Sequence, residues 1–322
     1  GVSKFSQVSL FSGLNNLFDI TLDPDYSSLC GYTDNDIDTV FAPELEGLDR
    51  EQIRAWYNGY NWLGEHVYNP YDVLNLFKKR VFKNYWFETG TLTFLIDLLF
   101  HRHVSSLALN SMHSSSSMLS SFDVDNITTE ALLFQTGYLT LKKQRQVGGQ
   151  IYYTLGYPNQ EVHQSLNELL LSTFTQNKSA QSDQSILLYD LLLKNDFEGL
   201  KTLFHSFFAS IPHHWYSKNE IQNYEGYYAS VFYSYFAALG LDVTVEDCTN
   251  LGRIDMTLKF NSQVYIFEFK VVELVPAGNA LQQIKDKAYA DKYRHLEQPI
   301  HLIGVEFSKD ERNVVEFEVE QV

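Results

Sequence analysis

The sequence of 322 residues contains only two cysteines, Cys30 and Cys248, which lie far apart and show no CxxC spacing. So few thiols argue against a disulfide-based scaffold, and they predict two reduced cysteines in an intracellular protein. No apolar run approaches the roughly 20 residues that a membrane-spanning helix needs, and no signal peptide is visible. We therefore expect a cytoplasmic protein that has no membrane partner.

Basic residues are also scarce, compared with acidic ones. The chain has 24 lysines and arginines against 40 aspartates and glutamates, a net charge of −16. Because phosphate backbones attract basic surfaces, this balance predicts only modest non-specific affinity for long duplex nucleic acid. Residues 220–322 are acidic as well, with 9 basic and 17 acidic side chains. A small basic rim could still form there from Arg253, Lys285, Lys287, Lys292 and Arg294.

The chain does contain enough hydrophobic residues for a large core. Hydrophobic residues make up 44% of the sequence and aromatic residues 15%, which argues against disorder. The length allows two or three domains with a substantial core. Many aromatic residues lie between positions 56 and 97, as in WYNGYNW at 56–62. They could form base-stacking platforms, but packing between helices is the interpretation we favour.

The most informative stretch is 251–270. It contains two short apolar runs, Ile254–Leu258 and Val264–Phe269, separated by the turn-forming pair Asn261-Ser262. This pattern predicts two neighbouring strands joined by a tight connection.

Three charged residues interrupt these expected strands: Asp255, Glu268 and Lys270. Side chains alternate along a strand, so Glu268 and Lys270 should point to one face while Phe267 and Phe269 point to the other. A carboxylate and a lysine in a hydrophobic strand are costly unless something compensates them. A divalent cation bound by Asp255 and Glu268 would do so, with Lys270 beside an activated water molecule.

An aspartate followed on the next strand by Glu-x-Lys is the pattern of the PD-(D/E)XK nucleases. Residues 224–293 resemble the nuclease-type domain at the C-terminus of a bacterial group whose N-terminal half resembles an AAA-type ATPase. The resemblance implies a restriction-endonuclease-like fold in the order α-β-β-β-α-β, within an α/β protein whose N-terminal half is rich in helices. The matching residues are Glu225, Gly252-Arg253-Ile254-Asp255, Glu268-Phe269-Lys270 and Ala280-Leu281-Gln282-Gln283-Ile284.

The resemblance also implies a site for phosphodiester hydrolysis. Asp255, Glu268 and the backbone carbonyl of Phe269 would bind Mg²⁺ or Mn²⁺. Lys270 would orient the attacking water or help to deprotonate it, and Gln283 would hold the scissile phosphate or the water. Glu225, on the preceding helix, would make a second-metal or water-mediated contact.

Three further residues are candidates for substrate binding. Arg253 could contact a neighbouring phosphate, although a structural salt bridge is an equal alternative for it. Lys285 belongs to the expected basic rim. Tyr289 could line the groove, but a structural role is the stronger interpretation.

The rest of the chain suggests three domains. Residues 1–120 resemble the late strand and helical lid of the AAA-like domain, with a strand at Val2–Leu10 and a Ser-rich loop within 104–130. Residues 121–215 predict a winged-helix-like module, with a hairpin near 138–155, and a helical bridge. Residues 216–322 form the nuclease-like domain. No GxxxxGK[ST] motif occurs, so we expect no ATP hydrolysis, and the ATPase-like half would lie upstream.

Two functions remain open from the sequence alone. The first is a metal-dependent nuclease, with DNA as the expected substrate. The second is a non-catalytic, nuclease-like module that docks a protein partner, which could be the upstream ATPase-like half or part of a toxin or regulatory complex. A likeness of fold does not decide between them.

Overall fold

The chain folds into two compact units, which we describe separately. The computed structural model describes residues 19–87, 98–99, 102, 104–120, 127–175, 178–211, 225–273 and 279–322. The first unit comprises Gly1–Val104 and Ala108–Ser165, and the second comprises Ser105–Leu107 and Leu166–Val322. Within the described ranges no helix is long and apolar enough to cross a membrane. The strand expected at Val2–Leu10 lies outside the described residues, and the division into three domains stays a prediction.

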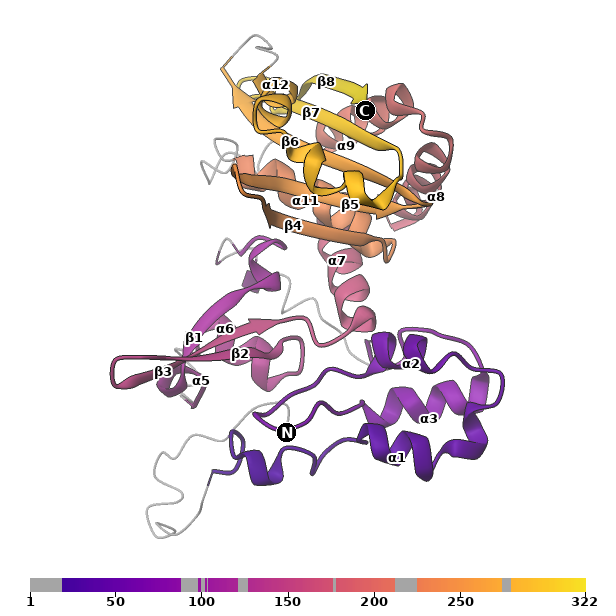
Figure 1. Ribbon diagram of the computed structural model, residues 1–322, viewed down its shortest axis with the longest axis vertical. Helices are drawn as coiled ribbons and strands as arrows, with labels where there is room; N and C mark the ends of the chain where they lie inside the picture. Colours follow the sequence, from indigo (N-terminus) through magenta and orange to yellow (C-terminus); the bar gives the residue numbers. More distant parts are fainter. Residues whose placement is uncertain are drawn as a thin grey trace. The chain divides into compact units, whose positions relative to one another are not determined.

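The first unit begins with short 3-10 turns at Pro24–Tyr26 and Ala42–Leu45 and three α-helices (Figure 1). Helix α1 spans Asp34–Thr39, α2 spans Arg50–Tyr57 and α3 spans Pro70–Lys79. Thr33 caps α1 in a reciprocal capping box with Asp36. The helices enclose an aromatic core that includes Tyr57, Tyr68, Phe77 and Tyr85. Packing is therefore confirmed as the role of these aromatic side chains.

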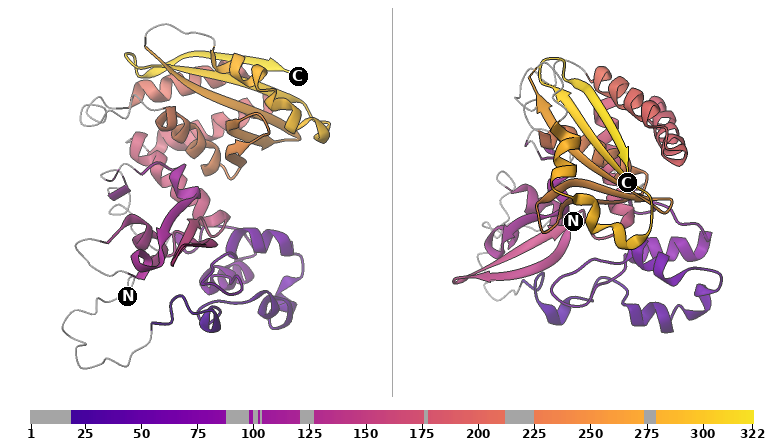
Figure 2. Two further views of the ribbon diagram at one scale, coloured as in Figure 1. Left: turned by 60° about the vertical axis from the view of Figure 1, so that its left-hand side comes forward. Right: turned by 45° about the horizontal axis from the view of Figure 1, so that its top comes forward.

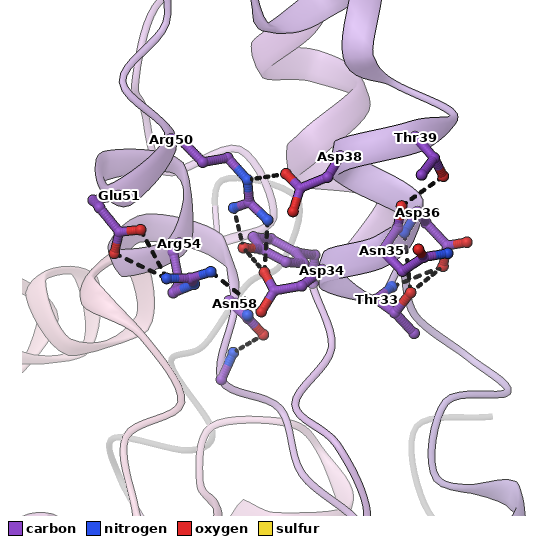
Figure 3. Close-up of polar contacts among 12 residues, drawn as sticks. Thr33, Asp34, Asn35, Asp36, Asp38, Thr39, Arg50, Glu51, Arg54 and Asn58 are labelled. Carbon is purple, nitrogen blue, oxygen red and sulfur yellow. Dashed lines mark hydrogen bonds and ion pairs between the residues drawn. The ribbon is translucent and has the colours of Figure 1, made fainter.

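Arg50 joins α2 to α1 through its guanidinium group (Figure 3). Its Nη2 lies 2.6 Å from Oδ1 of Asp34, its Nε lies 2.6 Å from Oδ1 of Asp38, and its Nη1 donates to the hydroxyl of Tyr68. Burial acts to raise the pKa of Asp34, but hydrogen bonds from Tyr68 and Arg50 outweigh it and lower that pKa. Arg54 adds a longer contact to Asp34, at 3.4 Å.

The second half of this unit is a three-stranded antiparallel sheet with short helices. Strand β1 spans Met112–Ser115, β2 spans Thr140–Val147 and β3 spans Gln150–Gly156, in the order β1-β3-β2. A 3-10 turn at Ala108–Asn110 precedes β1, and helices α5 (Ser116–Ser120) and α6 (Thr129–Gln135) follow it. The β2–β3 hairpin is the long two-stranded ribbon in the right-hand view of Figure 2.

The hairpin expected near 138–155 is confirmed, but the Ser-rich loop expected within 104–130 is wrong in part. Its serines form β1 and α5. The reason is tertiary, because β1 takes its backbone hydrogen bonds from β3, about forty residues further along the chain.

A buried pair of carboxyl groups links α3 to α7, which spans Gln160–Thr175. Asp72 and Glu161 are both fully buried, and the backbone N–H of Trp86 donates to both, at 2.8 and 2.9 Å. Burial raises the pKa of each carboxyl group, and the neighbouring Asp72 raises that of Glu161 further. The two groups can therefore share a proton.

The second unit is built on a five-stranded sheet in the order β4-β5-β6-β7-β8 (Figure 1). Its strands are Asp242–Cys248, Arg253–Phe260, Gln263–Val272, Ile300–Ser308 and Asn313–Gln321. Only β6 and β7 run parallel, and the segment between them contains α12, Asn279–Asp286. Helices α8 (Lys178–Lys194), α9 (Phe197–Ser210) and α11 (Glu225–Ala238) precede the sheet. The expected α-β-β-β-α-β order is confirmed, and β8 extends it.

Helices cover both faces of this sheet, as the alternation of β6 requires. Phe267 and Phe269 lie against Phe232 of α11, with ring centroids 6.2 and 5.1 Å away. Val264 and Ile266 point to the other face, into a core with side chains of α12. Glu268 follows this second set in the alternation and so belongs to the α12 face.

Helix α12 ends at Asp286, shortly before a break in the backbone. Ala288 adopts a left-handed conformation with φ of 48°, and the chain continues as 3-10 turns at Tyr289–Lys292 and Arg294–Leu296. The break lets two buried tyrosines reach separate partners. Tyr289 donates to the carbonyl of Arg253, and Tyr293 donates to Asp247.

Candidate active site

The β5–β6 hairpin places the two acidic residues. Asn261 and Ser262 both have left-handed backbones, with φ of 49° and 56°, which is typical of a tight two-residue hairpin turn. This turn sets a register in which Met256 pairs with Phe267. Asp255 precedes Met256, so the same register brings it to the part of β6 that contains Glu268.

The carboxylate of Asp255 is held by the backbone of the neighbouring strand. Its Oδ2 accepts the N–H of Phe269 at 2.9 Å. This bond ties the half-buried side chain to β6 between Glu268 and Lys270 in the sequence. The two carboxyl groups are close enough for the charge of Asp255 to raise the pKa of Glu268.

Glu268 is the most deeply buried residue of the site, with 1% of its surface exposed. Its Oε1 accepts a hydrogen bond from the amide of Gln283 and lies 3.5 Å from Nζ of Lys270. Its Oε2 is buried and has no hydrogen-bond partner within the described part of the chain. Burial, and then the charge of Asp255, raise the pKa of Glu268 to about 7, although Lys270 acts in the opposite direction.

Lys270 lies two positions further along β6, on the same face as Glu268. Its side chain is 26% exposed, so the ammonium group can reach both the buried carboxyl group and solvent. A cation in this place can bind a developing negative charge or hold a water molecule.

Helix α12 brings Gln283 to Glu268. Its first N–H groups, of Asn279 and Ala280, donate to Oε1 of the buried Glu306 at 2.7 and 3.3 Å. The helix lies very close to β7, because a Cβ at Gly304 would lie 2.3 Å from the backbone nitrogen of Leu281. Gly304 itself pairs with Glu268 in the β6–β7 register. The glycine therefore allows α12 to approach the sheet beside the carboxyl group.

Tyr289 borders the same cluster. Its hydroxyl donates to the carbonyl of Arg253 at 2.9 Å, and its side chain is 2% exposed. Burial, and then the charge of Glu268, raise the pKa of Tyr289, so its hydroxyl stays protonated. A Cβ at Gly252 would lie 2.8 Å from this hydroxyl, so the glycine leaves room for it.

The two remaining cationic candidates are not gathered into the cluster. Arg253 is exposed and pairs with Glu246 at 3.2 Å. Lys285 is exposed and pairs with Glu320 of β8 at 3.0 Å. The structure therefore brings together Asp255, Glu268, Lys270, Gln283 and Tyr289. The side chain of Glu225 lies outside the described residues.

The donor set can be tested against a divalent cation. Within the described ranges, no group of three or more His, Cys, Asp or Glu residues is arranged to hold a metal ion. The cluster does contain two adjacent carboxyl groups, and one of them has a buried oxygen that lacks a hydrogen-bond partner among the described residues. Such an oxygen is costly to bury unless something binds it. The residues fit a hard cation with Asp255 and Glu268 as protein ligands.

Sequence reasoning missed the residues that seat α12 on the sheet. Gly304 is an isolated glycine in the apolar run IHLIGVEF, which is a known sign of close backbone approach. Glu306 is a charged residue in that same run, and burial beside a helix N-terminus explains it.

Comparison with known proteins agrees with this geometry. Residues 223–317 match the family model of the PD-(D/E)XK nuclease superfamily. The matched segment contains every residue of the cluster, and the match supports a restriction-endonuclease-like fold for this part of the chain.

A second similarity extends over the whole chain. It is 64% identical over 322 residues to a protein of Azotobacter chroococcum mcd 1 whose name is "Uncharacterized protein in vnfD 5'region". The chain spans 62% of the length of that relative. No solved structure matches the chain significantly.

Proposed function

We propose that the second unit is a metal-dependent nuclease that hydrolyses phosphodiester bonds of nucleic acid, with DNA as the substrate. The observation that carries the proposal is the buried Glu268. It stands beside Asp255, Lys270 and Gln283, and one of its oxygens lacks a hydrogen-bond partner among the described residues. The superfamily match over 223–317 supports the same activity.

The chemistry assigned to a bound Mg²⁺ or Mn²⁺ is the activation of a water molecule and the neutralisation of charge on the phosphate. Asp255 and Glu268 would hold the cation, together with the carbonyl of Phe269. Asp255 is already oriented by the N–H of Phe269. Glu268 must lose its proton to act as a ligand, and its pKa near 7 puts that loss within the neutral range.

The other residues of the cluster act on the substrate. Lys270 stabilises the negative charge that grows on the phosphoryl oxygens and orients the attacking water. Gln283 fixes one oxygen of Glu268 and can offer its amide to the scissile phosphate. Glu225 would contact the cation or its water. Arg253 and Lys285 would reach the substrate only after leaving Glu246 and Glu320.

For the first unit we propose a supporting role. The order β1, α5, α6, β2, β3 with the sheet order β1-β3-β2 is that of a winged helix. The preceding helices would be the lid of an AAA-like domain, as the resemblance of residues 1–120 suggests. Without a phosphate-binding loop, this chain would not hydrolyse ATP.

Cleavage assays test the proposal. Supercoiled and linear DNA and a matched RNA are incubated with Mg²⁺ or Mn²⁺, beside the variant Asp255→Asn. We expect metal-dependent cleavage of DNA that Asp255→Asn abolishes while the variant stays folded. The acidic balance of residues 220–322 favours the alternative of a non-catalytic docking module. That alternative predicts no cleavage with either metal, and a protein partner whose binding survives Asp255→Asn.

A further inference from the structure

The first unit contains a region without acidic residues, in contrast to the acidic composition of the chain as a whole. Between Glu130 and Glu161 there is no acidic residue, although acidic residues outnumber basic ones 40 to 24 overall. The same segment contains the cations Lys142, Lys143 and Arg145. It includes the whole β2–β3 hairpin.

Strand register places two of these cations, Lys143 and Arg145, with other polar groups on one face of the sheet. Lys143 of β2 pairs with Thr154 of β3, which pairs with His113 of β1. Directly opposed residues of antiparallel strands share a face, so these three form a row. A second row consists of Arg145, Tyr152 and Ser115. We call these two rows the wing face.

The wing face is the solvent side of the sheet. Lys143, Arg145 and His113 are exposed, and Tyr152 is 38% exposed. The other face contains buried side chains: Leu141, Tyr153, Leu155 and Ser114. In the part of the chain that the structure describes, neither Lys143 nor Arg145 makes an ion pair. Both cations therefore lie on β2, on the same face of the sheet as the ring of Tyr152.

Two polar contacts hold side chains of the wing face in place. The hydroxyl of Thr154 and Nδ1 of His113 are 3.3 Å apart, and the hydroxyl of Tyr152 donates to Gln150 at 2.9 Å. The ring of Tyr152 is thus held at its hydroxyl end, which lowers the entropy lost when a flat partner stacks on it.

We propose that the wing face binds a single strand of nucleic acid. Lys143 and Arg145 contact consecutive phosphates, and Tyr152 stacks on a base. A cation–aromatic surface with no acidic residue complements this polymer, which alternates anions with flat rings. This inference rests on the proposed function, because it takes nucleic acid as the substrate. It adds a second nucleic-acid-binding surface, which lies outside the acidic nuclease-like domain.

The binding should be independent of sequence. Helix α6, which follows β1 and α5 and precedes the hairpin, has its central side chains buried. It therefore cannot present them to base edges in a groove, and phosphate contacts carry no sequence information.

The test uses the 322-residue chain with Asp255→Asn in EDTA, so that binding is measured without cleavage. The probe is a fluorescein-labelled oligothymidylate, and its binding is followed by fluorescence anisotropy across a range of salt concentrations.

The variant Lys143→Ala/Arg145→Ala should bind at least ~10-fold more weakly at low salt. The slope of its log affinity against log salt concentration should be smaller by about 1.4. Tyr152→Ala should weaken binding by about five-fold or more. The control Lys78→Ala/Lys194→Ala removes the same charge from two exposed helical sites and should leave binding unchanged.

Two results would overturn the inference. One is a Lys143→Ala/Arg145→Ala variant that binds like the control and keeps its salt slope. The other is equal binding to heparin with no effect of Tyr152→Ala, which would indicate a surface for acidic polymers in general. Neither result bears on cleavage, which is measured separately with metal. A failed wing face and a failed nuclease proposal are therefore distinguishable.

Discussion

Leu281 lies so close to Gly304 that a Cβ at position 304 would be 2.3 Å from its backbone nitrogen. Gly304 stands opposite Glu268 in the parallel β6–β7 register. The contact therefore sets the height of α12 above the sheet beside the buried carboxyl group. Through this approach Gln283 reaches Glu268 from a different element.

Gly304→Ala should push α12 away from the sheet, because backbone atoms cannot move aside like a flexible side chain. We expect a loss of about 2–3 kcal/mol in the free energy of unfolding, and a larger relative loss of cleavage than of DNA binding. Urea unfolding and cleavage rates measure the two effects. Gly226→Ala is the matched control, since a Cβ there meets nothing within 4 Å, and it should change stability by under ~1 kcal/mol. Equal stability of the two variants would contradict this account of α12.

Glu268→Gln should stabilise the metal-free protein while it abolishes cleavage. The pKa of Glu268 is raised from 4.5 to about 7 in the folded state by burial and by Asp255. The unfolded chain therefore loses this proton first, and stability falls as pH rises from about 4.5 to about 7. Glutamine avoids that loss, which is of order 3 kcal/mol at about pH 8.

Urea unfolding in EDTA at about pH 5 and about pH 8 measures this difference. The exposed Glu311→Gln serves as the control and should keep the pH dependence of the wild type. If Glu268→Gln also keeps that dependence, the carboxyl group is not held protonated by its surroundings.

Glu161→Gln should make the first unit less sensitive to alkaline pH. The folded-state pKa values of Glu161 and Asp72 are both raised, chiefly by burial. The stabilisation that this pair contributes is therefore fully present at acidic pH. It is lost as the pH rises through the folded-state pKa values of the two groups. The glutamine amide can replace the shared proton as a donor to Asp72. Melting followed by tryptophan fluorescence should show a smaller loss between about pH 6 and about pH 9 than in the exposed control Glu65→Gln.

Arg50→Ala should destabilise the first unit by about 1–3 kcal/mol, because Asp34, Asp38 and Tyr68 lose a shared charged donor. Arg54→Ala, in the same cluster of Figure 3, is the natural comparison. Its side chain is 43% exposed and its Nη2 lies 3.4 Å from Oδ2 of Asp34, so its removal should cost under ~1 kcal/mol. An equal loss in both variants would contradict the central position of Arg50.

Local sequence predicted much of the candidate site. Asn261-Ser262 indicates a turn, and the charged residues of the two flanking strands are visible as interruptions in apolar runs. These features depend only on neighbouring residues, so the β5–β6 hairpin could be placed before any tertiary structure was known. The resemblance named Gln283 and Glu268 as site residues, but it directed Gln283 to the phosphate or the water, and the contact between the two side chains comes from the structure.

The remaining features depend on partners distant in sequence. The serines of β1 look like a loop until β3 supplies their hydrogen bonds. The break at Ala288 is favourable because the hydroxyls of Tyr289 and Tyr293 find separate partners, the backbone carbonyl of Arg253 and the carboxylate of Asp247. The wing face requires the register of three strands, and the sequence alone suggested only a winged-helix-like module with a hairpin.

The measurement that tests the central claim most directly is the Mg²⁺- and Mn²⁺-dependent cleavage rate of DNA by Lys270→Ala. Lys309→Ala, which removes a lysine from an exposed ion pair in the same unit, is the control. We predict cleavage by the wild type and by Lys309→Ala, and a rate at least ~100-fold lower for Lys270→Ala, with its metal binding and fold intact. Cleavage that is unaffected by Lys270→Ala, or no cleavage and no metal binding by the wild type, would contradict the assignment of this cluster as a nuclease site.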